Sequence, residues 1–162
     1  MRRLFMLFGL LLLMPVQAMA EITVEDAWVR LPPPVADTAA GYMTIRNHSD
    51  RDIEITGIKT DIAEHPEFHS MEMDDGMMHM QKMEKVVVPA RSGISFDPGG
   101  NHLMLVGLTR ALEAGEHLMI TLETSNGKSI MVHAEVRDMR SGHAEMKHGG
   151  NDDDQGHHGM HH

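Results

Sequence analysis

The sequence predicts an all-β protein, built as an antiparallel β-sandwich or barrel. Almost every apolar segment alternates with a period of two residues and is rich in β-branched side chains. Turn-forming residues separate these segments at short intervals. No segment shows a sustained apolar period of 3.6 residues, so no long helix is expected. Many short strands at close spacing are typical of antiparallel sandwiches and barrels.

Seven strands follow directly from the alternating pattern. They are expected at residues 22–30, 41–47, 52–58, 94–97, 103–106, 117–123 and 129–136. The turns between them are expected at residues 32–34, 47–50, 75–76, 98–100 and 126–127. Asn126-Gly127 predicts a type I′ turn, because both residues tolerate the positive φ that this turn needs. Residues 60–68 are the one segment where a helical turn is considered, and Pro66 limits its length.

Residues 1–20 resemble an export signal. Arg2 and Arg3 precede an apolar stretch at residues 4–15, and Ala18-Met19-Ala20 fits a cleavage site after Ala20. The apolar stretch is short for a membrane span, and no second one follows, so stable membrane insertion is not expected. We therefore predict a signal peptide at residues 1–20 and a soluble mature protein outside the cytoplasm. An uncleaved membrane anchor is the alternative.

Composition narrows the classes of partner and chemistry. The leader contains two Arg and no acidic residue, which leaves 12 basic and 24 acidic side chains in the rest of the chain, a balance of −12. This charge argues against nucleic acids and anionic membranes as partners, and it favours cations or a basic protein surface. The chain has no Cys, which excludes a blue-copper site, a Cys nucleophile and disulfides. Residues 21–140 are long enough for one domain with one core.

Composition changes again at residue 141. Residues 141–162 hold six His, two Met, five Gly and the run Asp152-Asp153-Asp154, with almost nothing to bury. Such a segment is expected to be a flexible tail. Its imidazoles are expected to bind Cu(II) or Zn(II) adaptably, and they offer a route to metal-linked oligomers of an otherwise monomeric protein. A solvated tail that binds metal only at high concentration is the alternative. The candidate ligands are His143, His148, His157, His158, His161 and His162.

Methionine is the unusual residue of the chain. Thirteen of the 17 Met lie after the leader, and six of these fall between Met71 and Met83. If Asp75-Gly76 is a two-residue turn, Met71 opposes Met80 in a hairpin, with Cβ atoms ~5 Å apart. His69 shares a face with Met71, because side chains two apart on a strand point the same way. A slip of one residue in this register would move the Met set to the other face.

His69, Met80, His102 and Met104 form the predicted ligand set. Ten residues separate His69 from Met80, 21 separate Met80 from His102, and one separates His102 from Met104. Two imidazoles and two thioethers suit Cu(I), because soft sulfur selects this ion and a chain without Cys has only Met to supply it. Zinc is the competing metal, but it rarely takes a thioether ligand.

This spacing resembles the signature of the periplasmic copper chaperones called PCu(A)C. Flanking stretches are also similar: Trp28-Val29-Arg30, Ala40-Gly41-Tyr42-Met43, and residues 98–105 followed by Gly107-Leu108. The resemblance covers residues 22–136. It implies a cupredoxin-like β-sandwich that holds one Cu(I) through the four predicted ligands, with Met71 as an alternate ligand. It also implies copper delivery to the dinuclear copper centre of cytochrome c oxidase subunit II, with a thioredoxin-like Sco-type protein as a second partner. Part of the family carries a tail that binds Cu(II).

Three classes of function remain to be compared. The first is a copper chaperone that passes Cu(I) to a protein. The second is a periplasmic copper or zinc buffer, which the His-rich tail would also suit. The third is an enzyme, and it is disfavoured because the sequence contains no G-x-S-x-G, H-E-x-x-H or P-loop motif. The sequence therefore predicts a non-enzymatic copper carrier.

Overall fold

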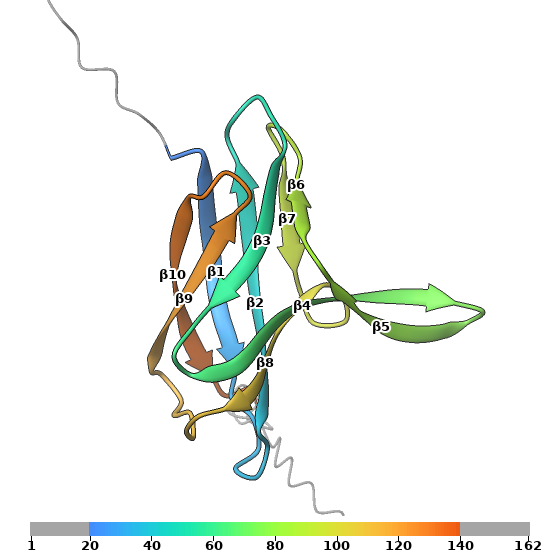
Figure 1. Ribbon diagram of the computed structural model, residues 1–162. Helices are drawn as coiled ribbons and strands as arrows, with labels where there is room; N and C mark the ends of the chain where they lie inside the picture. The colour runs from blue at the N-terminus through green and yellow to red at the C-terminus, as the bar shows by residue number, and fades with distance from the viewer. Residues whose placement is uncertain (1–19, 140–162) are drawn as a thin grey trace, which may run out of the picture.

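The computed structural model describes residues 20–139, and all regular secondary structure in this range is β-strand (Figure 1). Neither the predicted signal peptide nor the predicted tail, with its six His, falls inside this range, apart from Ala20. Residues 20–139 contain no helix that is long and apolar enough to span a bilayer. The strands are β1 (Ile22–Arg30), β2 (Thr38–Asn47), β3 (Ile53–Lys59), β4 (Ala63–Asp74), β5 (Met77–Met83), β6 (Val86–Val88), β7 (Gly93–Phe96), β8 (His102–Leu108), β9 (His117–Thr124) and β10 (Ser129–Arg137).

The strands form one mixed sheet that is mostly antiparallel. Its order is β5-β4-β8-β2-β1-β10-β9-β3-β6, and β7 pairs with the remaining length of β2. One pairing departs from the predicted antiparallel arrangement: β1 and β10 run parallel, with Trp28 opposite Glu135. The two strands lie at opposite ends of the described chain, so no short hairpin constrains their direction.

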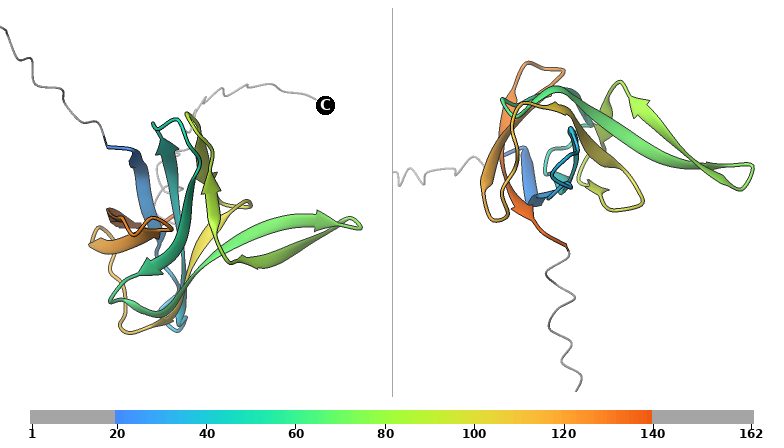
Figure 2. Two further views of the ribbon diagram at one scale, coloured as in Figure 1. Left: turned by 45° about the horizontal axis from the view of Figure 1, so that its top comes forward. Right: turned by 90° about the horizontal axis from the view of Figure 1, so that it is seen from below.

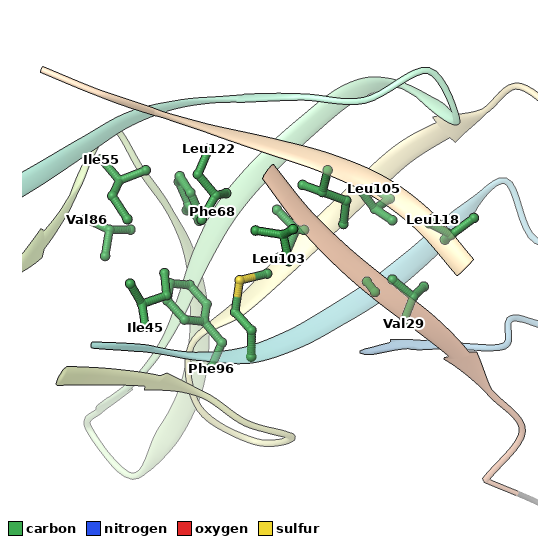
Figure 3. Packing of buried hydrophobic residues seen from close by; sticks show 14 of the residues in the cluster. Val29, Ile45, Ile55, Phe68, Val86, Phe96, Leu103, Leu105, Leu118 and Leu122 are labelled. Carbon is green, nitrogen blue, oxygen red and sulfur yellow. The ribbon is translucent and has the colours of Figure 1, made fainter. Parts of the chain in front are cut away.

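The sheet curls so that its two halves enclose a single apolar core (Figure 2). In Figure 3, Ile45 and Phe96 from β2 and β7 face Ile55 and Val86 from β3 and β6. The ring centroids of Phe68 and Phe96 lie 5.7 Å apart across this core. The predicted all-β sandwich is confirmed, and its layers pack because alternate residues of each strand point inward.

Residues 60–68 form no helical turn in the structure. β4 begins at Ala63 and includes Pro66, which pairs with Leu105 of β8. Pro66 is tolerated because β5 pairs with β4 only from Phe68 onward, so the missing N–H of Pro66 faces an open edge. The short strand β6 was also not expected from the sequence, because three consecutive Val show no alternation.

The two Asx-Gly turns differ from each other. Asp75 and Gly76 both have positive φ, at 47° and 78°, and they form the two-residue turn between β4 and β5. At the other turn, Gly127 has positive φ but Asn126 does not, and Gly127 N–H donates to Thr124 O. The predicted type I′ turn at Asn126-Gly127 is therefore wrong. The β9–β10 connection is a three-residue loop with Gly in the left-handed position.

The β4–β5 hairpin extends well beyond the body of the sheet as an arm (Figures 1 and 2). The pairing of β4 with β8 ends at His69 and His102, whereas the pairing of β4 with β5 continues to Asp74 and Met77. Among the residues that the structure describes, residues 70–81, called the arm below, are thus paired only with each other. This arrangement leaves His69 at the base of the arm, where three strands meet.

Candidate metal centre

Two histidines from non-adjacent parts of the chain meet at the base of the arm. His69 of β4 lies directly opposite His102, the first residue of β8, and their ring centroids are 5.6 Å apart. His102 is buried, and the side chain of His69 is 13% exposed. Directly opposed residues point to the same face of a sheet, so both rings lie on one side of it.

The His102 ring is held with one nitrogen free for a ligand. Its Nδ1 lies 3.0 Å from the Gly100 carbonyl oxygen. A carbonyl oxygen only accepts, so Nδ1 carries the proton and donates, and Nε2 of the neutral ring keeps its lone pair. That Nε2 lies 3.3 Å from Met80 Sδ, which also carries lone pairs. A metal ion between them would satisfy both atoms.

The His69 ring is held through its Nε2 atom, whereas the His102 ring is held through Nδ1. His69 Nε2 donates to Glu67 Oε2 over 2.8 Å. Its Nδ1 is buried and has no hydrogen-bond partner among residues 20–139. A buried polar atom without a partner is costly unless something satisfies it. The Nδ1 lone pair therefore marks a second position for a metal ligand.

Glu67 orients His69 and is itself held by Lys82. Lys82 Nζ donates to Glu67 Oε1 over 2.7 Å. The Lys82 ammonium, followed by the His69 ring, lowers the pKa of the Glu67 carboxyl below its ordinary value. The same carboxylate raises the pKa of Lys82. Glu67 thus stays ionised near neutral pH, and a carboxylate on the second nitrogen of a ligating His fixes its tautomer and orientation.

The predicted methionine ligands lie around the two rings. Met80 is paired with Met71 across the hairpin, as the sequence predicted, and it is 54% exposed. Met104 lies two residues along β8 from His102, on the same face, and is paired with Glu67 of β4. The structure therefore places all four predicted ligands, and the alternate Met71, on one face around the base of the arm.

Sequence reasoning missed Glu67, Lys82 and the Gly100 carbonyl. Glu67 precedes His69 by two residues, so strand alternation places both on one face. The predicted hairpin register also places Lys82 opposite His69. The sequence thus contained both the two-residue spacing and the register. They place Glu67 and Lys82 beside His69 only if the strand is known to extend back through Pro66. His79 is paired with Glu72 and lies on the other face of the hairpin from Met80.

The donor set fits a soft monovalent ion. No three His, Asp or Glu side chains gather in a metal-binding arrangement within the described part of the chain. The nearest donor to the free His102 nitrogen is instead a thioether. Imidazole and thioether together suit Cu(I), which accepts irregular coordination of low number.

Comparison with known proteins agrees with this description. The family described as "Putative lipoprotein LpqE-like" matches residues 22–136. A protein of Leifsonia xyli subsp. xyli, "Putative lipoprotein Lxx21020", is 28% identical over 127 residues, which cover 78% of this chain and 75% of the relative.

Two solved structures share the fold. The solution structure of CuI-DR1885 from Deinococcus radiodurans is 33% identical, with a TM-score of 0.63, over 76% of this chain and 82% of that one. The copper-bound PCuAC domain from PmoF2 has a TM-score of 0.64 over 77% of this chain and 99% of that one, at 24% identity. The PCuAC domain thus has the same fold as this chain, and on the family match over residues 22–136 the chain belongs to the LpqE-like family.

Proposed function

We propose that this protein is a copper chaperone that binds Cu(I) through His69, Met80, His102 and Met104 and hands it to another protein. The observation that carries the proposal is the convergence of two imidazole lone pairs and one thioether. His69 Nδ1 has no partner among the described residues, and His102 Nε2 faces Met80 Sδ at 3.3 Å. The other nitrogen of each ring donates to a protein acceptor, the Glu67 carboxylate for His69 and the Gly100 carbonyl oxygen for His102.

The site is arranged for release as well as for binding. Half of the Met80 surface is exposed, so an acceptor can approach the ion from that side. Thioethers are neutral and bind less strongly than thiolates, so transfer to a thiolate-containing acceptor is downhill. The imidazoles lie deeper and hold the ion while the exchange of ligands begins. This combination distinguishes a carrier from a permanent structural metal site.

The relatives support the same ion. The DR1885 structure is described as its Cu(I) form, and the PmoF2 domain is described as copper-bound. Only the first shares enough sequence with this chain to bear on its ligands. We infer that this chain and DR1885, which share the fold, hold copper at the same end of the sheet.

The acceptor that we propose is the dinuclear copper centre of cytochrome c oxidase subunit II, either directly or through a Sco-type thioredoxin-like protein. The protein would act in the periplasm after cleavage at Ala20. The acidic balance of the chain favours an acceptor with a basic docking surface. We further propose that the His of residues 141–162 bind Cu(II), a borderline ion that suits imidazole.

Anaerobic transfer tests the proposal directly. The full mature chain is loaded with one equivalent of Cu(I) and mixed with an apo subunit II fragment, and the copper content and the mass of both proteins are followed. Copper should leave this chain and appear in the acceptor. The Met80→Leu variant should deliver less copper, and His133→Gln, which changes an exposed His on β10, is the matched control.

Stoichiometry separates the chaperone from a buffer. A chaperone takes up one tightly bound Cu(I), with any Cu(II) bound more weakly elsewhere. A buffer takes up many equivalent ions and shows no preference for an acceptor. Uptake of many equivalent ions, with no transfer to a thiolate acceptor, would contradict the proposed function.

A further inference from the structure

The arm carries an exposed row of methionines that leads away from the candidate metal centre. Side chains alternate along each strand, and directly paired residues share a face. The pairs Met71–Met80 and Met73–Met78 therefore lie on the face that also carries His69. The opposite face carries Ser70 with Gln81, Glu72 with His79, and Asp74 with Met77. One face of the arm is thus a continuous double row of thioethers.

Packing does not account for this row. Met73 is 72% exposed and Met78 is 48% exposed, and neither belongs to the hydrophobic core. Beyond His69, no other strand within residues 20–139 pairs with β4 on the side away from β5. Two exposed apolar side chains opposite each other at the end of a two-stranded arm stabilise the fold little. Their identity calls for another explanation.

The spacing of the row suits the stepwise movement of an ion. Paired Cβ atoms lie ~5 Å apart, and successive pairs on one face are separated by about 7 Å along the strands. The Met side chain is unbranched and has three rotatable bonds, so sulfurs of neighbouring pairs can approach one ion in turn. Cu(I) accepts two or three soft ligands, so an ion can move between pairs without losing all of its ligands.

We propose that Met73 and Met78 form a transient Cu(I) site near the tip of the arm, through which the ion reaches and leaves the candidate metal centre. This proposal rests on the proposed function. In each step, a Cu–S bond to Met73 or Met78 breaks as a bond to Met71 or Met80 forms. The ion stays Cu(I), and thioethers carry no proton, so neither electrons nor protons are exchanged. Glu72, Asp74 and Asp75 at the tip add attraction for a cation.

Binding at the tip can be observed on individual methionines. The full mature chain, labelled with 13C in the Met methyl groups, is titrated with Ag(I), a soft ion of the same charge that resists oxidation. The first equivalent should shift the methyl signals of Met80 and Met104. Further Ag(I) should shift those of Met73 and Met78, while the signal of Met77 on the other face stays in place.

The two ways of failing can be told apart. If Met80 and Met104 respond but Met73 and Met78 do not, the tip site is wrong and the proposed function stands. If Met80 and Met104 do not respond at all, the proposed function itself is wrong. A shift of Met77 equal to those of Met73 and Met78 would indicate nonspecific binding and would also overturn the tip site.

Kinetics tests the role of the site. In the double variant Met73→Leu, Met78→Leu, the equilibrium affinity for Cu(I) should stay unchanged. The rate of Cu(I) transfer to a chromogenic chelator should fall by about tenfold, which corresponds to about 1.4 kcal/mol at the barrier. The matched control is Met77→Leu, Met131→Leu, because both of these Met are exposed and lie off the row. Equal rates in the two double variants would overturn the proposal, as would a loss of equilibrium affinity.

Discussion

His102 Nε2 lies 3.3 Å from Met80 Sδ, although 21 residues lie between the two in the chain. The two atoms meet because β4 pairs with β8 on one side and with β5 on the other. With Nδ1 of His102 directed to the Gly100 carbonyl, both facing atoms present lone pairs. Two facing lone pairs form no hydrogen bond with each other, and both can serve as ligands of one soft cation.

Methionine ligation can be separated from packing by a swap that conserves volume. Met80→Leu and Met104→Leu should each lower Cu(I) affinity by about tenfold or more, because a soft ligand is lost. Each swap should cost less than about 1.5 kcal/mol of unfolding free energy. Competition with a chromogenic Cu(I) chelator measures the affinity, and urea unfolding measures the stability. Met119→Leu, an exposed Met on β9, is the control. If both variants bound Cu(I) as tightly as the parent chain, the thioethers of Met80 and Met104 would not be ligands.

Cu(I) binding should weaken in mild acid. Protons compete with the ion for the lone pairs of His69 Nδ1 and His102 Nε2, because an imidazole must be neutral to bind a metal. Thioethers do not titrate, so binding should decline without vanishing. Chelator competition across about pH 5 to 8 measures this dependence. A flat profile would mean that the imidazoles are not ligands.

Much of the candidate site could be predicted because it is local. The Asp75-Gly76 turn determines the hairpin register, and strand alternation then places His69, Met71 and Met80 on one face. The pairing of His69 with His102 could not be predicted, because it depends on contact between β4 and β8 across more than 30 residues. The same limit applies to the parallel pairing of β1 with β10. The Asn126-Gly127 dipeptide indicated a turn but not its type. The type depends on where the strands stop pairing, and here the last pair is Thr124 with Lys128, whose carbonyl accepts the Thr124 N–H.

Removal of residues 141–162 should leave the Cu(I) site and the thermal stability nearly unchanged. This segment contains little apolar surface, so it can add little to the core. The same truncation should reduce the capacity for Cu(II), because it removes six of the 13 His of the chain. Metal stoichiometry of the full and truncated chains, in both oxidation states, measures the effect. Loss of Cu(I) binding on truncation would contradict the separation into two sites.

Glu67 should tune the copper affinity without touching the ion. Glu67→Gln weakens the hold on His69 Nε2 while keeping the size of the side chain, so His69 Nδ1 is less well oriented. Loss of such an orienting partner typically lowers metal affinity by about 10- to 100-fold. Lys82→Gln should have a smaller effect in the same direction, because Lys82 acts on His69 only through Glu67. Chelator competition measures the Cu(I) affinity of both variants. An equal loss of affinity in the two would contradict the smaller effect expected for Lys82→Gln.

The free energy of unfolding in acid should also depend on Glu67. Its pKa is lowered in the folded chain, first by Lys82 and then by His69. A carboxyl whose folded pKa lies below its unfolded value contributes stability that is fully present above the unfolded value and is lost as the pH falls through the folded one. Glu67→Gln should therefore be less stable than the parent near neutral pH. The difference should close as the pH falls through the lowered folded pKa of Glu67, where the carboxyl takes up its proton. Urea unfolding across this range measures the difference, with Glu64→Gln, an exposed carboxyl on the same strand, as the control. A difference that persists unchanged into acid would mean that the substitution disturbs packing around β4 rather than removing the ion pair.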